Sequence, residues 1–434
     1  MAIPAPVTAR ASLGLWTRIG WTSFGGPAGQ ISLMHRAVVE ERGWVSEERF
    51  LHALSFCTLL PGPEAQQLAT YLGWVTRGVR GGVAAGALFV LPGVLVMWLL
   101  SVAYVTYGDV EVIAAMLAGV QAAVIPIIVD AVLKVGRRAL HGWVAVALAV
   151  ASFVAITFLA IPYPFVVLAA LAVGALLLRT PVSSLGDDLT ELGVTPGQRH
   201  RALVAGVGAA ILWLAPVAVL VGTLGRDHVL SQEAVFFSKT ALITFGGAYA
   251  VLGYVAQQAV TTYGWVTPND MVTGLGLAET TPGPLILVVQ FVGFLGAYNA
   301  PGSLPPLLAG TLGAAVTVWV TFLPCFMFIF LGAPYVERLR HQPRLAAALR
   351  GVTAAVVGVI ASLALVFTLQ VVFGAVTTVS VGRLRVPDPD WSAVAWGQLA
   401  IAALAAVAIF RLRWGVLRTI GAAALLGVLG SLIG

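Results

Sequence analysis

Charged residues are scarce in this chain of 434 residues. Asp, Glu, Lys and Arg together make up 10% of the sequence, against about 25% in a typical soluble domain. Hydrophobic residues make up 59%, and the mean hydropathy is +0.96. A soluble fold of this length has too little interior for so much apolar surface. A soluble protein is therefore excluded, and a membrane protein is indicated.

Cysteine is nearly absent, and the two cysteines and six histidines form no recognisable site. Cys57 and Cys325 lie far apart, each in an apolar stretch, without disulfide or metal-ligand spacing. The sequence also lacks a Ser/His/Asp order, an HExxH motif and a phosphate loop. Its N-terminus lacks the pattern of a cleaved signal peptide. We therefore expect no metal, no cofactor and no enzyme activity, and we expect the first apolar segment to stay in the mature protein.

The net charge is +6, from 24 Lys and Arg against 18 Asp and Glu. In a chain this apolar, the basic excess is attributed to cytoplasmic loops by the positive-inside rule, and no nucleic-acid partner is expected. The same excess is compatible with an anionic substrate.

Several apolar stretches are long enough to cross about 30 Å of hydrocarbon. They are 82–106, 111–133, 142–160, 162–179, 203–224, 307–333, 351–374, 393–410 and 416–433. The polar stretch 180–201 is the best candidate for a linker. We therefore expect a first repeat at 1–180, a linker with a connecting transmembrane helix at 181–230, and a second repeat at 231–434.

An internal repeat relates the two halves. Three motifs recur at a constant offset of 221 residues: FGG at 24 and 245, GWV at 43 and 264, and PGP at 61 and 282. Arg18 matches Lys239 at the same offset. Further along the offset becomes 232, and the eleven extra residues are expected in the turn-rich stretch 299–306. A constant offset through three motifs predicts a duplication.

The charges of the loops indicate how the halves are oriented. Successive loops of the first half, from Arg77 to Arg179, are basic, acidic, basic, uncharged and basic. From 298–306 onward, the loops of the second half are neutral, basic, balanced and basic. Basic loops face the cytoplasm, so equivalent loops lie on opposite sides, and the unmatched span 203–224 supplies the reversal. The sequence therefore predicts an all-α polytopic membrane protein with two inverted-topology repeats, a common architecture of secondary transporters.

The regions 10–78 and 232–298 have shorter apolar runs that Gly and Pro interrupt. We expect helical hairpins broken at GGP and PGP; the helices expected in the first half are 10–24, 28–42, 46–60 and 64–78. Pro27 and Pro63 suit the start of a helix, where free N–H groups and about half a positive charge form an anion site. Inverted repeats would bring several helix starts together near the midplane. The alternative is that these motifs are packing kinks.

Ionisable and amide side chains lie beside these turns. Glu64 follows the first PGP turn and is either a proton-coupling carboxylate or an ordinary first-turn residue; Glu279 precedes the second turn. Arg18 and Lys239 are matched cations in apolar segments, and they either attract substrate or reach toward the interface. Amides that could hydrogen-bond an oxyanion, or alternatively join helices, belong to Gln66, Gln67 and Gln290. The charged run 35–49 reads as a solvated loop, within which His35 can titrate near neutral pH.

The motifs of the first half extend well beyond these turns. Residues 24–36 read FGGPAGQISLMHR, followed by GW at 43–44, FLHAL at 50–54 and LPGPEAQQLA at 60–69. The second half has TPGP at 281–284 and QFVG at 290–293. These stretches resemble the chromate ion transporter family in its long-chain, two-domain form, over nearly the whole chain. One departure is Ala248, which stands where the first half has Pro27.

The resemblance implies chromate efflux driven by protons, with sulfate as a similar competitor, and hence chromate resistance. It implies a multi-pass protein of the bacterial inner (plasma) membrane. The expected partners are the chromate or sulfate dianion, protons, the lipid bilayer and, as one compatible oligomeric state, a second copy in a homodimer. The substrate-binding candidates are Arg18, Phe24, Gly25, Gly26, Pro27, Gln30, Pro61, Gly62, Pro63, Gln66, Gln67, Lys239, Phe245, Gly246, Gly247, Thr280, Thr281, Pro282, Gly283, Pro284 and Gln290. The proton-coupling candidates are Glu64, Glu279 and His35.

Three hypotheses for the function stay open at this point. The first is a secondary oxyanion transporter for chromate or sulfate, in its simplest form a proton antiporter; the second is an anion channel on the same scaffold. The third is a membrane enzyme or scaffold subunit. The inverted repeat and the carboxylates beside the turns favour the first, and the missing catalytic motifs disfavour the third. We expect the FGG and PGP glycines of both halves to cluster near mid-membrane around a polar cavity.

Overall fold

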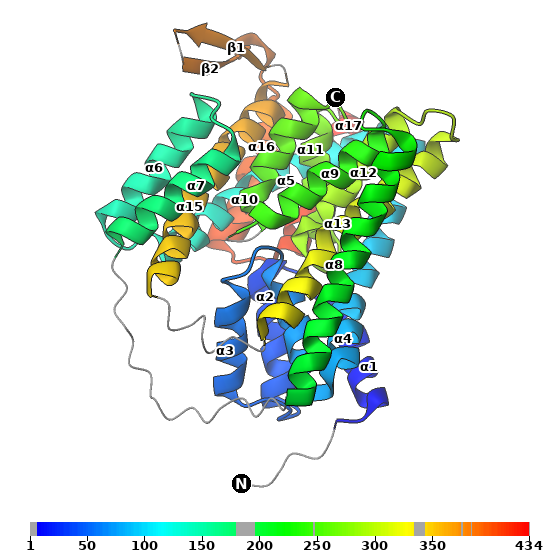
Figure 1. Cartoon of the computed structure of the whole chain (residues 1–434). Coiled ribbons are helices and arrows are strands. Elements are labelled where there is room, and N and C mark those ends of the chain that lie inside the picture. Colours follow the sequence, from blue (N-terminus) through cyan, green and yellow to red (C-terminus); the bar gives the residue numbers. More distant parts are fainter. Residues whose placement is uncertain are drawn as a thin grey trace.

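The computed structural model describes residues 7–178, 196–245, 248–333, 343–374, 376–382 and 384–433. These residues form a bundle of helices (Figure 1), so the predicted all-α, polytopic class is confirmed. Among them, strands occur only in one antiparallel hairpin, β1 (Val376–Val381) and β2 (Leu384–Pro389). The sequence predicts this stretch only as a charge-balanced loop.

The Gly- and Pro-interrupted region of each half folds into short helices. In the first half they are α1 (Ala9–Thr22), α2 (Gly26–His35) and α3 (Glu47–Cys57). In the second half they are α9 (Val229–Ile243), α10 (Ala248–Gln257) and α11 (Pro268–Thr280). The longest, α9, has 15 residues, about 22 Å at 1.5 Å per residue. Each is too short to cross the roughly 30 Å of a bilayer core alone.

Matching local signals shape the short helices of both halves. A single π-helical turn extends α2 at Arg36–Glu40 and α10 at Gln258–Thr262. The loops that follow turn at Gly43 and Gly264, whose φ angles are +58° and +65°. Ser46 then caps α3, and Thr267 forms a capping box with Asp270 at the start of α11. These caps satisfy amides that a helix start leaves unpaired.

The helix after the first PGP turn, α4 (Glu64–Tyr107), reverses direction within its length. Its backbone is not helical at Arg77 and Gly78. Across this reversal Gly73 and Gly81 pack so closely that a Cβ on either would collide with the backbone of the other. The first part of α4 is therefore a half-length helix packed antiparallel to the long second part.

The second half makes the same reversal with a longer connection. A 3₁₀ turn (Leu285–Leu287) leads into α12 (Val288–Asn299), which packs against α13 (Pro306–Gly332). Gly293 and Gly313 make the close contact here. The loop between α12 and α13 lies in the stretch where the sequence predicts the extra residues.

Longer helices surround these elements. Within the described residues, the helices long and apolar enough to cross a membrane are α4, α5 (Glu111–Ala139), α8 (Pro196–Leu224), α13 and α15 (Pro343–Phe373). Shorter apolar helices are α6 (Trp143–Thr157), α7 (Tyr163–Leu177), α16 (Trp396–Ala406), which continues as a π turn to Arg411, and α17 (Val416–Ile433). Each coincides with an apolar stretch predicted from the sequence.

The outer helices are exchanged between the halves. Helices α6 and α7 of the first half pack against α15 of the second, whereas α16 and α17 of the second half pack against α5 of the first. Gly351 on α15 meets Gly174 on α7, and Gly119, its match on α5, meets Gly427 on α17. Since glycines permit close helix approach, the two halves interlock through equivalent contacts.

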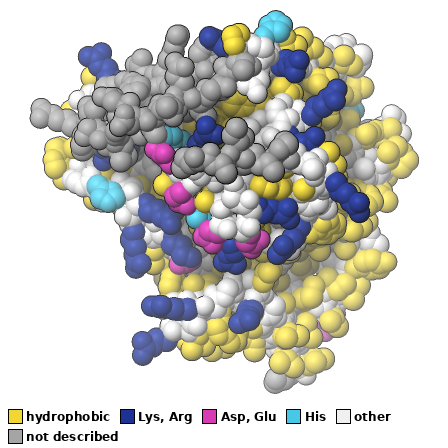
Figure 2. All heavy atoms as spheres, turned by 90° about the horizontal axis from the view of Figure 1, so that it is seen from below, with side chains coloured by type: hydrophobic (Ala, Val, Ile, Leu, Met, Phe, Trp, Pro, Cys, Tyr) yellow, Lys and Arg dark blue, Asp and Glu magenta, His cyan; other side chains and the backbone are white. Residues whose placement is uncertain are grey.

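The two sets of short helices occupy different ends of the molecule. In Figure 1, α1–α3 lie in the lower part, and α9–α11 lie in the upper part, on the side of β1 and β2. Lys and Arg side chains are spread over the lower face, which Figure 2 shows from below. The prediction that basic loops face the cytoplasm would place this face on the cytoplasmic side. The inverted relation and the domain limits stay predictions, and the linker residues 179–195 lie outside the described residues.

Candidate anion site at the crossed turns

The two PGP turns meet the two FGG motifs crosswise. The Gly62 N–H of the first half donates a hydrogen bond to the Thr244 carbonyl of the second half, at 2.7 Å. The Gly283 N–H of the second half donates to the carbonyl of Ser23 at 2.9 Å and approaches its hydroxyl at 3.1 Å. Gly62 and Gly283 match at the offset of 221, and so do Ser23 and Thr244. The same contact is therefore made once in each direction.

Both central residues of these turns require glycine. The φ angle is +120° at Gly62 and +95° at Gly283, a region that side chains disfavour. A Cβ at Gly62 would also lie 2.8 Å from Cys325 Sγ and 2.9 Å from Gln67 Nε2. Gly93, which matches Cys325 at the offset of 232, packs against the second PGP turn. Each turn is thus enclosed by a helix of the other half.

Buried glutamines hold the crossing together. The Gln30 side-chain amide donates to the carbonyls of Gly283 and Ser23, and the Gln67 amide donates to the Pro61 carbonyl at 2.7 Å. In the described chain, four buried glutamines have a side-chain oxygen without a hydrogen-bond partner; they are Gln30, Gln66, Gln67 and Gln290. Because buried polar groups are normally satisfied, these oxygens mark the surroundings of the crossing as a place for further polar partners.

Free backbone donors follow the first turn. The N–H groups of Glu64, Ala65 and Gln66 open α4 and have no acceptor among the described residues. The next amide, that of Gln67, bonds the Pro63 carbonyl at 3.1 Å. The glycine amides of the PGP turns are already bonded across the halves, so the helix start just beyond the turn, and not the turn itself, supplies free N–H groups.

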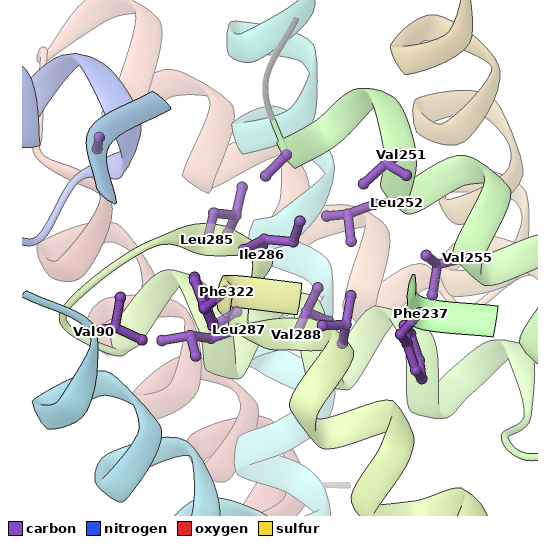
Figure 3. Packing of buried hydrophobic residues seen from close by; sticks show 14 of the residues in the cluster. Val90, Phe237, Val251, Leu252, Val255, Leu285, Ile286, Leu287, Val288 and Phe322 are labelled. Carbon is purple, nitrogen blue, oxygen red and sulfur yellow. The ribbon is translucent and has the colours of Figure 1, made fainter. Parts of the chain in front are cut away.

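The two turns differ in their surroundings. At the first, Pro61 and Glu64 are partly exposed, and Gly25 at the neighbouring GGP tip is exposed. At the second, the turn runs into buried apolar residues, and Figure 3 shows Leu285, Ile286, Leu287 and Val288 among other hydrophobic side chains. The predicted site is therefore accessible at the first turn and sealed at the second.

The carboxylates beside the two turns also differ. Glu279, on the last turn of α11, is buried and accepts a hydrogen bond from the Tyr249 hydroxyl of α10. Glu64 is the first residue of α4, next to the free N–H groups. The neighbouring hydroxyls of Thr280 and Thr281 both donate to the Leu277 carbonyl. The carboxylate and the threonine hydroxyls before the second turn are thus hydrogen-bonded, whereas Glu64 stands beside N–H groups that have no acceptor among the described residues.

Some predicted site residues are not brought to the crossing. Arg18 and Lys239 have exposed side chains on α1 and α9. His35 is the last residue of α2, where its Nε2 is 2.6 Å from Glu47 and its Nδ1 is 3.1 Å from Glu40. Gly246 and Gly247 lie outside the described residues.

A cavity of about 510 Å³ opens at the end of the bundle where α4 ends and α5 and α11 begin. Its lining includes Tyr104, Asp109, Gln121, Asp270 and Asn299. The Tyr104 hydroxyl donates to Asp270. No lining residue belongs to a PGP or FGG motif, so this polar cavity is separate from the crossed turns.

Sequence reasoning missed several residues at the crossing. Ser23 and Thr244 both carry a hydroxyl and stand directly before the FGG motifs, so the offset of 221 could have identified them. Cys325 is far from the first turn in sequence, yet its sulfur lies beside Gly62. Tyr249 had no such signal, because its bond to Glu279 depends on the packing of α10 against its neighbours.

Half-length helices whose broken tips meet in crossed pairs, within a shell of spanning helices, define a polytopic membrane protein of the transporter type. The family model for chromate transporters matches residues 12–175 and 231–428. The chain therefore belongs to the chromate transporter family. No solved structure shows a significant match.

Three relatives illustrate the similarity. The chromate transport protein of Pseudomonas aeruginosa is 35% identical over 363 residues, which cover 83% of this chain and 81% of the relative. The chromate transport protein of Cupriavidus metallidurans is 32% identical over 360 residues, covering 81% of each chain. The uncharacterized transporter YwrB of Bacillus subtilis is 29% identical over 161 residues, which cover 36% of this chain but 82% of that one. A chain of about half the length thus matches part of this one.

Proposed function

We propose that this protein is a secondary transporter that exports chromate across the bacterial plasma membrane in exchange for protons. The observation that carries the proposal is the crossed pair of bonds from Gly62 to Thr244 and from Gly283 to Ser23. Each bond places the PGP turn of one half against the residue that ends α1 or α9 in the other half. Export of chromate from the cytoplasm would give the cell chromate resistance.

The anion would bind at the start of α4. The free N–H groups of Glu64, Ala65 and Gln66 and the positive end of the helix suit an anion without any Lys or Arg. Such donors recognise the charge and shape of an anion. Sulfate is a tetrahedral dianion like chromate and is therefore expected to compete with it. The partial exposure of this turn and the basic face below it in Figure 2 support loading from the cytoplasmic side.

Alternation between the two sides would follow from the duplicated halves. The reciprocal bonds at the turns and the reciprocal packing of α6 and α7 on α15 and of α16 and α17 on α5 support a two-fold relation. The positions of α1–α3 and α9–α11 at different ends support an inverted one (Figure 1). Two states that exchange the environments of the two turns would expose the site first to one side and then to the other.

Glu64 would make anion binding depend on pH, because its carboxylate competes for the same N–H groups. At an effective dielectric constant near 20, two unit charges 4 Å apart interact by about 4 kcal/mol, so an ionised Glu64 would weaken binding of a dianion strongly. We expect Glu64→Gln to raise the affinity for sulfate at neutral pH by at least about tenfold, and to flatten its pH dependence. Glu48→Gln, an exposed change on α3, is the control.

Flux in proteoliposomes tests the proposal. Purified protein is expected to move chromate faster under an imposed pH gradient at zero membrane potential, and unlabelled sulfate is expected to inhibit. Flux that ignores the pH gradient and does not saturate would instead identify an anion channel. Stronger binding of sulfate than of chromate, with the same coupling, would identify a sulfate transporter.

A further inference from the structure

Glu233 on α9 is fully buried, and neither carboxylate oxygen has a hydrogen-bond partner among the described residues. No other described carboxylate combines complete burial with two unpartnered oxygens. It lies away from the crossed turns, and nothing in the proposed anion site uses it. An ionised carboxylate in such a place is very costly, so the neutral, protonated acid is the form that this arrangement accommodates.

The surrounding helices are shaped to hold this carboxyl group. A Cβ on Gly296 of α12 would lie 2.9 Å from one oxygen, and a Cβ on Gly313 of α13 would lie 2.9 Å from the other. Glycine at both positions therefore makes the space that the carboxyl group fills. Trp265 packs against Gly296 on the same side, and it stacks on Tyr263 at a ring distance of 4.2 Å.

A polar stripe leads from this carboxyl group along α13 to the first PGP turn. Gly313, Thr317, Thr321 and Cys325 follow at intervals of four residues, which places them on one helix face. The hydroxyls of Thr317 and Thr321 are buried without a partner in the described chain, although other threonines of the protein bond the carbonyl four residues earlier. Cys325 ends the stripe beside Gly62.

The first half supplies the comparison that separates this stripe from ordinary packing. At the offset of 232, the matching face of α4 carries Gly81, Ala85, Phe89 and Gly93, which have no polar side chain. Both faces are buried, so burial alone does not require hydroxyls there. At the offset of 221, Glu233 itself matches Ser12.

Among the described residues, no counter-ion faces Glu233. Helices α8, α10, α12 and α13 pack against α9. Ionisable groups on these elements and their loops are Arg199, His200 and Arg201 at the far end of α8, Arg226, Asp227 and His228 before α9, Lys239, Tyr249, Tyr254, Tyr263, Tyr298 and Cys325. Glu233 has no hydrogen bond from any described group, and the ion pairs found in the described chain do not include it. The described residues therefore offer no group that stabilises its ionised form.

The cavity at the α4 and α5 end adjoins this carboxyl group. Leu295, Tyr298 and Asn299 of α12 line the cavity, while Gly296 between them faces Glu233. The Asn299 side chain donates to the Trp265 carbonyl at 3.2 Å. The wall between the cavity and Glu233 is thus one turn of α12 with Trp265, on the side opposite the basic face.

We propose that Glu233 is the residue that carries the proton across, loaded from this cavity and linked to the anion site by the Thr317 and Thr321 hydroxyls. This rests on the proposed proton-coupled transport and assigns its proton site. The carboxylate takes up one proton when the cavity side is open and releases the same proton when the opposite side opens. Glu233 does not contact the anion, so anion exchange without net proton movement needs no titration of this residue.

Two flux assays on Glu233→Gln test the assignment. Uptake of chromate driven by a pH gradient is expected to fall more than tenfold, whereas exchange of external chromate for internal sulfate at equal pH is expected to stay within twofold of the wild-type rate. Thr317→Val and Thr321→Val, which keep the shape and remove the hydroxyl, are expected to slow only the gradient-driven uptake. Ser12→Ala at the matched position, and Thr311→Val elsewhere on α13, are expected to change neither.

Each contrary result has its own meaning. Gradient-driven uptake by Glu233→Gln at the wild-type rate would overturn the proton site and leave coupled transport intact. Loss of both activities would show a structural role. Failure of Glu233→Gln to fold would also contradict the proposal, because glutamine has the shape of the neutral acid. Wild-type flux indifferent to the pH gradient would reject the coupled transport on which the assignment rests.

Discussion

Replacing Gly62 with alanine tests the crossed turns directly. The new Cβ would sit on a backbone with φ of +120°, which costs about 1–3 kcal/mol for a residue other than glycine. It would also lie 2.8 Å from Cys325 Sγ and 2.9 Å from Gln67 Nε2, and such overpacking costs a further ~1–3 kcal/mol. We therefore expect Gly62→Ala to destabilise the protein by about 2–6 kcal/mol.

Matched variants separate the two causes. At Gly283 the φ is +95°, but a new Cβ would meet its nearest atoms at 3.5 Å or more, so Gly283→Ala should cost only the conformational part, about 1–3 kcal/mol. Cys325→Ala should relieve part of the cost at Gly62 in the double variant. Gly14→Ala, at a helical position with no atom within 4 Å, should be neutral or stabilising.

Thermal unfolding in detergent, followed by the loss of monodisperse protein, measures these differences. The expected order of stability is Gly14→Ala, then Gly283→Ala, then Gly62→Ala, with Cys325→Ala partly restoring the last. Equal melting temperatures for Gly14→Ala and Gly62→Ala would refute the close packing of the first PGP turn. A double variant no better than Gly62→Ala would show that the sulfur does not limit the space there.

Two further predictions concern the anion site and the loop after β2. In the Cys57→Ala variant, Cys325 is the single remaining thiol. Sulfate bound at the first turn is expected to slow the alkylation of Cys325 severalfold relative to chloride. Equal alkylation rates in sulfate and in chloride would place the anion elsewhere. The Ser392 hydroxyl and amide donate to Asp390 and lower the pKa of that carboxyl. The stabilisation from these bonds is present above the ordinary Asp pKa and is lost as the pH falls through the lowered pKa of Asp390. Ser392→Ala removes the hydroxyl donor and brings the pKa of Asp390 back toward its ordinary value. We therefore expect residues 384–396 of this variant to lose protection from hydrogen exchange at a higher pH.

The repeat made much of the fold predictable. The offset of 221 identified both PGP turns, and the interrupted apolar runs predicted short helices near α1, α2 and α3. The hydropathy of the longer runs located the apolar part of each spanning helix, although α4, α8 and α15 begin earlier than their predicted stretches. These features are local, because Gly and Pro act on the backbone around them and apolar length is measured along the chain.

The exchange of outer helices could not be predicted in the same way. Helices α6 and α7 are apolar on all sides, so no polar face indicates which neighbour they pack against. Helices α6 and α7 match α16 and α17 at a third offset, 253, instead of 221 or 232. At this offset Trp143 corresponds to Trp396 and Gly174 to Gly427. The β1–β2 hairpin lies within this longer connection. Contacts between halves depend on packing in space, which the spacing of motifs does not encode.

The repeat also directed attention away from the residue that differs most. A comparison at constant offset finds only the residues that the two halves share. Glu233 matches Ser12, and Thr317 and Thr321 match Ala85 and Phe89, so these positions differ between the halves. The sequence does show Glu233 as an acidic residue within an apolar run. A comparison of matched motifs does not single it out, because its partner position carries a different residue.

A duplicated chain with crossed bonds can divide its chemistry between the halves. The first half presents Glu64 and free N–H groups at an accessible turn, whereas the matched turn of the second half is sealed by Leu285 and its apolar neighbours. The second half instead holds Glu233 and the hydroxyl stripe of α13, which ends at Cys325 against the first turn. Because each turn is enclosed by the other half, a movement that opens one turn must displace the helix that carries the other half's polar groups. Coupling between an anion in one half and a proton in the other would then follow from the interlocked packing, without direct contact between the two ions.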